Sequence, residues 1–392
     1  MKRTLLVDTN RAAVPIYRAL CAMGHEVWVV GGKPSEPLAK LAPNYVQLDY
    51  SDAGRLARFV DEKAFDYIVP GCTDRSYKVC ADISGGRFPG LDTPANTTAI
   101  NTKSEFRKAA TRIGLSVPRI LSMEQAGAVE SVIVKPADSF SGRGMTVLRK
   151  PGADSLSIAF DNACRASSTR NAIIEEFVAG QLFSHSAFIR DTKVVADFVV
   201  QEECVTNSFA VDTSRMASGF PVEMLGSLRE DVRRLAVSLQ LVDGLVHTQF
   251  IAKGSRYWII EVTRRCPGDL YSLLIELSTG YPYATSYAAT FVGEAVVPCP
   301  DSRVRDRITR HTVTSRDGAA LWGFRFRMPV DIRLFVPLAV AGDFIEASPD
   351  GRAGILFFSS SSAGEQEVLY RKLLDGELYR FDLEQSDTGV TK

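Results

Sequence analysis

The chain has 392 residues, 45% of them hydrophobic and 23% charged, which is the composition of a globular protein large enough for about two to four domains. Its 46 lysines and arginines balance 46 aspartates and glutamates, so the charge gives no sign of the basic surface that nucleic-acid binding needs. No apolar run approaches the roughly 20 residues that cross a bilayer. Seven cysteines without a CxxC pair are typical of reduced thiols, and we therefore expect a cytoplasmic protein that binds neither nucleic acid nor membrane.

The N-terminal part alternates short apolar runs with helical stretches. The expected strands and helices are strands 4–7, 27–30, 45–48 and 67–69 and helices 14–23 and 51–63. This alternation predicts an open, doubly wound parallel sheet, whose ligands bind at the carboxyl ends of the strands. Those ends are Asp8–Asn10, Gly31–Gly32 and Gly71–Asp74. No GxGxxG follows the first strand, so a dinucleotide site is not supported.

The remainder of the chain changes character twice. A proline- and glycine-rich break at Phe88–Pro94 precedes a helix over 97–113, and mostly strands and turns follow up to Val200. A later helix and two strands precede a proline-bounded, strand-rich segment. The pattern predicts an α/β protein with an α+β middle part and three domains: 1–96, 97–295 and 296–392.

The most informative segment is a strand that ends in Lys135, followed by a loop of small residues and a return strand. Glycines in the loop Ser139–Met145 would let backbone N–H groups approach an anion, and Lys135 would add a positive charge for phosphate oxygens. A simple hairpin with a solvated lysine is equally compatible with this segment taken alone.

Two further segments carry acidic side chains at strand positions. The strand that ends in Glu175-Glu176-Phe177-Val178 could form a pocket for a nucleotide base, although two exposed glutamates at a strand end are the favoured interpretation of this segment taken alone. The strands 244–252 and 257–262 would place Gln249 beside Glu261, and oxygen ligands of this kind suit magnesium when phosphates and waters complete the shell. Arg265 follows the second strand, where a guanidinium could stabilise a transferring phosphoryl group.

The order and spacing of these segments are more specific than any one of them. Lys135 with its glycine loop, Glu175-Glu176 and the late pair Gln249 and Glu261 together resemble the ATP-grasp superfamily over roughly Met1 to Tyr281. The helix that begins near Lys103 looks like the first helix of that family's domain. The segment after Arg265 is similar to the carboxylate–amine (L-amino acid) ligase branch. The resemblance implies an open-sheet domain, a two-lobed ATP-grasp domain and a small strand-rich C-terminal domain.

The resemblance also implies roles for individual residues. Lys103 and Lys135 would contact ATP, and the loop with Ser139, Ser141, Gly142, Gly144 and Met145 would cover its phosphates. Glu175 and the backbone of Glu176, Phe177 and Val178 would hold adenine. Gln249, Glu261 and Thr263 would bind Mg²⁺, with Mn²⁺ as a substitute, and Arg265 would stabilise an acyl phosphate.

Three positions depart from the family pattern. Gln249 stands where glutamate is common, as it also does in carbamoyl phosphate synthetase, and Thr263 stands where asparagine is common. The acid that contacts ribose is absent from Gln181-Leu182-Phe183, and Glu176 could replace it.

The leading hypothesis is an ATP-dependent ligase that joins a small carboxylic acid to an amine through an acyl phosphate and releases ADP and phosphate. A bicarbonate-activating enzyme of the carboxylase or carbamoyl-phosphate type is an alternative, as is a nucleotide-binding protein without turnover. A homodimer is left open. We expect Cys266, His185 and His247 to be structural rather than catalytic.

Overall fold

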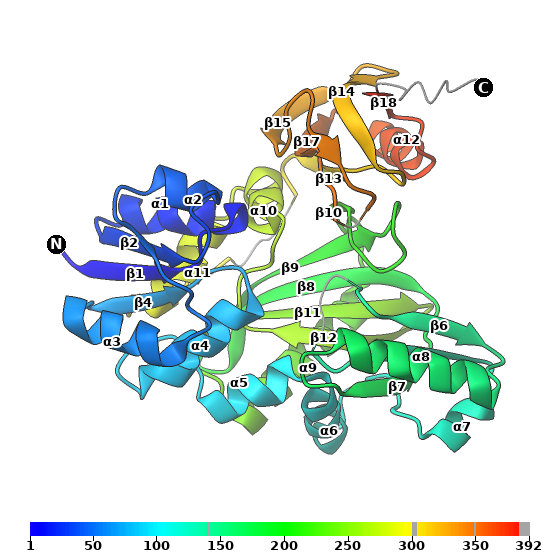
Figure 1. Ribbon diagram of the computed structural model, residues 1–392, viewed down its shortest axis with the longest axis horizontal. Helices are drawn as coiled ribbons and strands as arrows, with labels where there is room; N and C mark the ends of the chain where they lie inside the picture. The colour runs from blue at the N-terminus through cyan, green and yellow to red at the C-terminus, as the bar shows by residue number, and fades with distance from the viewer. Residues whose placement is uncertain (139–141, 300–303, 349, 384–392) are drawn as a thin grey trace, which may run out of the picture. The chain divides into compact units, whose positions relative to one another are not determined.

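The computed structural model describes most of the chain (Figure 1). The described residues are 1–138, 142–299, 304–348 and 350–383. The chain forms two compact units. Unit 1 comprises Met1–Val200 and Ala217–Arg303, and unit 2 comprises Gln201–Met216 and Val304–Lys392. Among the helices that the structure describes, none has the length and apolar character that crossing a bilayer requires.

Unit 1 begins with the parallel sheet that the sequence predicts. Its strands are β1 (Arg3–Val7), β2 (Glu26–Gly31), β3 (Tyr45–Gln47) and β4 (Tyr67–Pro70), in the order β3-β2-β1-β4. The intervening helices are η1 (Arg11–Ala13), α1 (Val14–Ala22), α2 (Pro37–Leu41), α3 (Ala53–Lys63) and α4 (Asp74–Ser84). All three strand pairings are parallel, which confirms the α/β prediction.

The strand order reverses between β1 and β4, and the two strands end in a shared hydrogen-bonded cluster. Asp8 follows β1 and accepts a hydrogen bond from the backbone N–H of Cys72, which follows β4, at 2.9 Å. Gly71 is required there because a Cβ at this position would lie 2.1 Å from the Cβ of Asp8. Residues 71–74 are therefore held against the end of β1, at the switch point where ligands of such sheets bind.

A small antiparallel sheet forms the next part of unit 1. It consists of β5 (Ser131–Pro136), β6 (Thr146–Arg149) and β7 (Ala172–Glu176), with β5 in the centre. Helices α7 (Met123–Gly127) and α8 (Ala153–Ala166) accompany it, and α8 lies along the sheet (Figure 1). Val132, Val134 and Ile174 from the strands pack against Leu156 and Ala163 of α8. This core fixes the strand ends that carry Lys135 and Glu175.

A second, larger antiparallel sheet completes unit 1. Its strands are β8 (Gln181–Arg190), β9 (Lys193–Glu203, whose last three residues belong to unit 2), β11 (Gly244–Lys253) and β12 (Arg256–Thr263), in the order β12-β11-β8-β9. The remaining helices of unit 1 are α5 (Pro94–Asn101), α6 (Lys103–Ile113), α9 (Val222–Leu239), α10 (Tyr271–Thr279) and α11 (Tyr283–Phe291). The apolar faces of α6 and α9 bury Phe106, Leu228 and Leu235 against Val246 and Phe250 of β11.

Unit 2 is rich in strands, as expected for the C-terminal part. Its elements are β10 (Thr213–Met216), β13 (Arg307–Val313), β14 (Ala319–Phe326), β15 (Asp331–Pro337), β16 (Phe344–Ile345), β17 (Gly354–Ser360), α12 (Ala363–Leu374) and β18 (Tyr379–Leu383). The pairing of β10 with β13 adds the segment Gln201–Met216 to this unit, which the domain boundaries predicted from the sequence do not include.

Candidate active site

Lys135 and Glu175 come together at the ends of neighbouring strands of the small sheet. The register pairs Lys135 of β5 with Ile173 of β7, and the Lys135 ammonium donates to Glu175 Oε2 at 2.7 Å. The Glu175 side chain is completely buried, and that of Lys135 is 9% exposed. The solvated-lysine interpretation of this segment is therefore wrong: the ammonium is an interior group.

Arg107 of α6 is a third member of this cluster, and the sequence analysis did not select it. Its Nε lies 2.7 Å from Glu175 Oε1, and its Nη2 donates to the backbone oxygen of Ile260 at 2.8 Å. The guanidinium is 2% exposed. Arg107 lies four residues after Lys103, on the same face of the helix, and this spacing is the signal in the sequence that could have identified it.

The charged groups in this cluster shift the pKa values of Glu175 and Lys135. Burial by itself raises the pKa of Glu175, but Lys135 and Arg107 outweigh burial and hold the pKa of this carboxyl group below its ordinary value. Burial lowers the pKa of Lys135, and the charge of Glu175 opposes that effect. Lys103, half-buried at the start of α6, also acts electrostatically on Lys135 and on Asp74.

The segment predicted to hold adenine leaves the small sheet directly after Glu175. The carboxylate of Glu175 forms ion pairs with Lys135 and Arg107. The carboxylate of Glu176 accepts a hydrogen bond from Arg119 Nε at 2.8 Å. The N–H of Phe177 donates to the Ser131 oxygen, and the Phe177 side chain is 36% exposed; Val178 is half-buried. This geometry leaves the Phe177 side chain and the Val178 backbone as the part of the segment available to a base.

The predicted phosphate loop lies partly outside the described residues, since Ser139 and Ser141 belong to the residues that the structure does not describe. Gly142 and Gly144 have φ values of +71° and +72°, and the N–H of Met145 donates to the Gly142 oxygen at 3.3 Å. A Cβ on Gly144 would lie 2.4 Å from that of Ala166, so glycine is required there.

The two predicted metal ligands face each other across neighbouring strands. Gln249 of β11 is the register partner of Glu261 of β12, and the register shifts immediately after Gln249. Glu261 is exposed and Gln249 is half-buried, so the glutamate inside the apolar strand does not bear the cost of burial. The described residues contain no group of three His, Cys, Asp or Glu side chains arranged to hold a metal. An ion here would need ligands from a nucleotide or water.

Thr263 and Arg265 both contact Asp74, the first residue of α4. The Thr263 hydroxyl donates to Asp74 Oδ1 at 2.9 Å, and Arg265 Nε donates to the same oxygen at 3.0 Å. Burial opposes the charge on Arg265, but Asp74 holds the pKa of this guanidinium above its ordinary value. The sequence placed Asp74 at a strand end where ligands bind, yet gave no sign of its contact with Arg265.

The two histidines and the cysteine near the site are all buried. His247 Nδ1 lies 2.8 Å from Ser186 Oγ, and burial lowers the pKa of His247 to about 3. His185 Nε2 lies 3.0 Å from Asp197 Oδ2, and Cys266 is fully buried. These positions agree with structural roles.

Comparison with known proteins assigns the central part of the chain to a protein family. Residues 100–269 match the family model of an ATP-grasp domain. The chain contains an ATP-grasp domain. This domain holds Lys103, Arg107, Lys135, Glu175 and the strands with Gln249 and Glu261. Asp74 lies outside it, at the start of α4, which follows strand β4 of the parallel sheet.

Curated relatives and solved structures agree with this assignment. The chain is 26% identical over 207 residues to the large chain of carbamoyl phosphate synthase from Vibrio vulnificus (strain CMCP6), a match that covers 50% of this chain and 19% of that protein. The chain thus spans about a fifth of the length of the curated relatives it matches. An L-amino acid ligase from Bacillus licheniformis superposes with a TM-score of 0.76 at 17% identity, covering 98% of this chain and 99% of that one.

Two further structures have the same fold. Phosphoribosylglycinamide synthetase from Anaerococcus prevotii gives a TM-score of 0.74 at 17% identity, with 98% of this chain and 100% of that chain covered. The biotin carboxylase domain of 2-oxoglutarate carboxylase from Hydrogenobacter thermophilus gives 0.75 at 14% identity, with 97% and 91% covered. At these identities the matches establish the fold that the chain shares with ligases and carboxylases.

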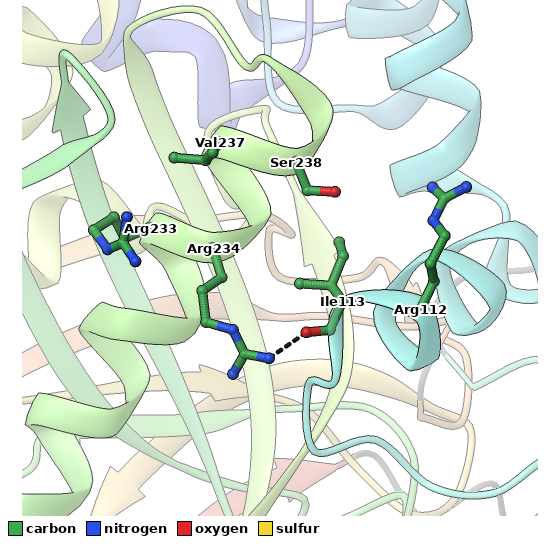
Figure 2. Close-up of a pocket in the computed structure, with 6 residues that line it drawn as sticks. All are labelled: Arg112, Ile113, Arg233, Arg234, Val237 and Ser238. Atoms are coloured by element: carbon green, nitrogen blue, oxygen red, sulfur yellow. Dashed lines mark hydrogen bonds between the residues drawn. The ribbon is translucent and has the colours of Figure 1, made fainter.

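A cavity of about 340 Å³ lies elsewhere in the ATP-grasp domain, between α6 and α9 (Figure 2). Its lining residues are Arg112, Ile113, Arg233, Arg234, Val237 and Ser238. Glu230 and Asp231 neutralise two of the three arginines, and Arg234 also donates to the Ile113 oxygen. Both helices end beside this cavity, and their partial negative charges offset the third arginine. The cavity therefore lacks the net positive charge that nucleotide phosphates require.

Proposed function

We propose that the chain is an ATP-dependent ligase that forms an amide or peptide bond between a small carboxylic acid and an amine. The observation that carries the proposal is the arrangement of charged and polar groups within one ATP-grasp domain. The buried ammonium of Lys135 lies on the small sheet, the Gln249–Glu261 pair lies on the large sheet, and Arg265 follows the strand that carries Glu261. Cations for phosphates and oxygen ligands for a metal are what phosphoryl transfer from ATP requires.

The nucleotide would be held by both sheets. Lys103 and Lys135 would neutralise phosphate oxygens, and the loop that includes Gly142 and Gly144 would cover them. The segment from Glu176 to Val178 would hold adenine, with the Phe177 ring against the base. Covering the phosphates excludes water, which protects an acyl phosphate from hydrolysis.

The part of the large sheet that carries Gln249 and Glu261 suits a hard cation. Exposed Glu261 and the amide oxygen of Gln249 would bind Mg²⁺ or Mn²⁺, with nucleotide oxygens and waters as the other ligands. The ion would supply charge neutralisation during phosphoryl transfer. We retain Thr263 as a further candidate, although its hydroxyl donates to Asp74 Oδ1.

Arg265 is placed to act on the acid substrate. A carboxylate oxygen of the acid would take the terminal phosphoryl group of ATP, and ADP would leave. The amine nitrogen would then attack the acyl carbon, lose a proton and expel inorganic phosphate. The guanidinium of Arg265, 19% exposed and near Glu261, would stabilise the acyl phosphate through its remaining N–H groups.

A bicarbonate-activating reaction is the second candidate. It is favoured by the match to the carbamoyl phosphate synthase large chain, by the structural likeness to a biotin carboxylase domain and by glutamine at position 249. The two reactions share the phosphorylation of a carboxylate-like oxygen, so both assign the same roles to Lys135 and Glu261.

The decisive experiment measures ADP and phosphate release with Mg²⁺ and ATP across a panel of carboxylic acids paired with amines, and separately with bicarbonate. Release that requires an acid and an amine together, with an amide product by mass spectrometry, supports the ligase. Release that requires only bicarbonate supports the second candidate. Binding of a non-hydrolysable ATP analogue without release under any condition would leave a nucleotide-binding protein without turnover and refute both.

A further inference from the structure

The buried cluster of Lys135, Glu175 and Arg107 contains one carboxylate and two cations. Lys135 Nζ lies 2.7 Å from Oε2 of Glu175, and Arg107 lies 2.7 Å from Oε1 through Nε and 3.4 Å from Oε2 through Nη2. The three side chains are 9%, 0% and 2% exposed, so water does not replace any partner that leaves. One carboxylate is therefore shared by two cations that both lie in the interior.

Nucleotide binding makes a conflicting demand on Lys135. Under the proposed function, its ammonium must reach a phosphate oxygen, whereas in this structure it is directed at Glu175. If Glu175 had Lys135 as its only partner, the move would leave a fully buried carboxylate without a counter-charge, which is among the most unfavourable states in a protein interior. The lysine would then stay with the glutamate, and phosphate binding would be weak.

Arg107 removes this conflict. We propose that Arg107 is a positioning residue for the nucleotide: it neutralises Glu175 so that Lys135 can pass from this carboxylate to a phosphate oxygen. The inference rests on the proposed function, because it takes ATP as the ligand of Lys135. It assigns Arg107 no contact with the nucleotide and no part in the chemistry.

The anchoring of Arg107 fits this role. Its Nη2 donates to the oxygen of Ile260 on β12, the residue before Glu261, at 2.8 Å. The guanidinium is thus fixed between the small sheet, through Glu175, and β12, the strand of the large sheet that carries Glu261. Arg107 Nη1 has no hydrogen-bond acceptor among the residues that the structure describes, and the 2.7 Å contact of Nε with Oε1 lacks hydrogen-bond alignment. Charge is therefore the main interaction with Glu175.

The test is a double-mutant cycle on the full chain, in which the charges of Arg107 and Glu175 are removed singly and together. The dissociation constant of the ATP analogue AMPPNP is measured with Mg²⁺ by calorimetry for the wild type, R107M, E175Q and R107M/E175Q, with circular dichroism as the folding control. R107M should weaken binding about tenfold or more, because Glu175 then retains Lys135. Adding E175Q should recover most of the loss, because no carboxylate remains to retain the lysine.

In variants that circular dichroism shows to be folded, the rescue distinguishes this role from simple structural support, because E175Q removes the carboxylate that retains Lys135 in R107M. The inference is overturned if folded R107M binds AMPPNP within about twofold of the wild type, or if the double variant binds no better than R107M. If R107M does not fold, the double variant is compared with E175Q: a difference of about threefold or less supports the inference, and a larger loss overturns it. Failure of the wild type itself to bind AMPPNP would instead refute the proposed function.

Discussion

The candidate site contains two clusters of charged side chains. Their ion-pair distances are similar, but their exposure to solvent differs. The buried cluster, Lys135, Glu175 and Arg107, has side chains between 0% and 9% exposed. The half-exposed cluster, Asp74, Glu261 and Arg265, includes an ion pair whose partners are 39% and 19% exposed, and Glu261 is exposed. Both contain contacts of 2.7 to 3.0 Å.

Burial decides what each cluster can do. In the buried cluster, loss of one partner leaves a charge that water does not reach, so its members depend on one another. In the half-exposed cluster, water or a substrate can take the place of a partner at small cost. We therefore expect the buried cluster to set nucleotide affinity, and the half-exposed cluster to exchange its contacts during the reaction. The following experiments test this division, from the largest expected effect to the smallest.

The largest effect is expected from Glu261→Gln in the half-exposed cluster. Turnover, measured as ADP release, should fall by about a thousandfold, because the metal neutralises charge that develops during phosphoryl transfer. AMPPNP affinity should change much less. Gln249→Glu is the matched control on the neighbouring strand, and it should keep turnover or raise magnesium affinity. If Glu261→Gln kept the turnover of the wild type at saturating magnesium, the assignment of the metal site to Gln249 and Glu261 would be wrong.

A smaller effect is expected from Lys135→Ala in the buried cluster. AMPPNP affinity should fall by about a hundredfold, since a charge is removed from the phosphates in a site of low dielectric. The fold should persist because Glu175 keeps Arg107 as its partner. The exposed lysine Lys193 provides the control, and Lys193→Ala should bind as the wild type does. Calorimetry decides, and an unchanged dissociation constant for Lys135→Ala would contradict the phosphate assignment.

Burial should also be visible in the pH dependence of stability, through His247. Burial lowers the pKa of this side chain from 6.5 to about 3, so the unfolded chain takes up a proton first as the pH falls. The stability that neutral His247 supplies is complete above pH 6.5 and is lost as the pH falls toward 3. Between pH 7 and pH 5 the wild type should lose about 2 kcal/mol more unfolding free energy than His247→Gln. Urea unfolding at both pH values measures this, and equal losses would refute it.

The smallest effect is expected where an ion pair is mostly exposed. Arg119 and Glu176 are 69% and 24% exposed and lie 2.8 Å apart. Arg119→Ala should therefore change the free energy of unfolding by less than about 1 kcal/mol, which thermal unfolding would detect. A much larger loss of unfolding free energy would show that exposure does not limit what this ion pair contributes.

The sequence by itself determined the elements and the residue types of the site. Alternating apolar runs and helices predicted the parallel sheet, because a strand–helix–strand repeat returns each strand in the same direction. The short connection between β11 and β12 predicted that Gln249 and Glu261 are neighbours, and the register confirms it. Lys135 was selected through the order and spacing of several segments, because its strand end and glycine-rich loop taken alone are equally compatible with a simple hairpin.

Only the tertiary structure decided which of these groups share a partner. Arg107 meets Glu175 across 68 positions of the chain, and Arg265 meets Asp74 across 191. No periodicity or turn signal encodes such contacts, because they depend on how α6 and α4 pack against sheets formed by other parts of the chain. Burial was decided in the same way: Glu175 and Glu176 are adjacent acids in the sequence, yet one is fully buried between two cations and the other lies at the surface beside Arg119.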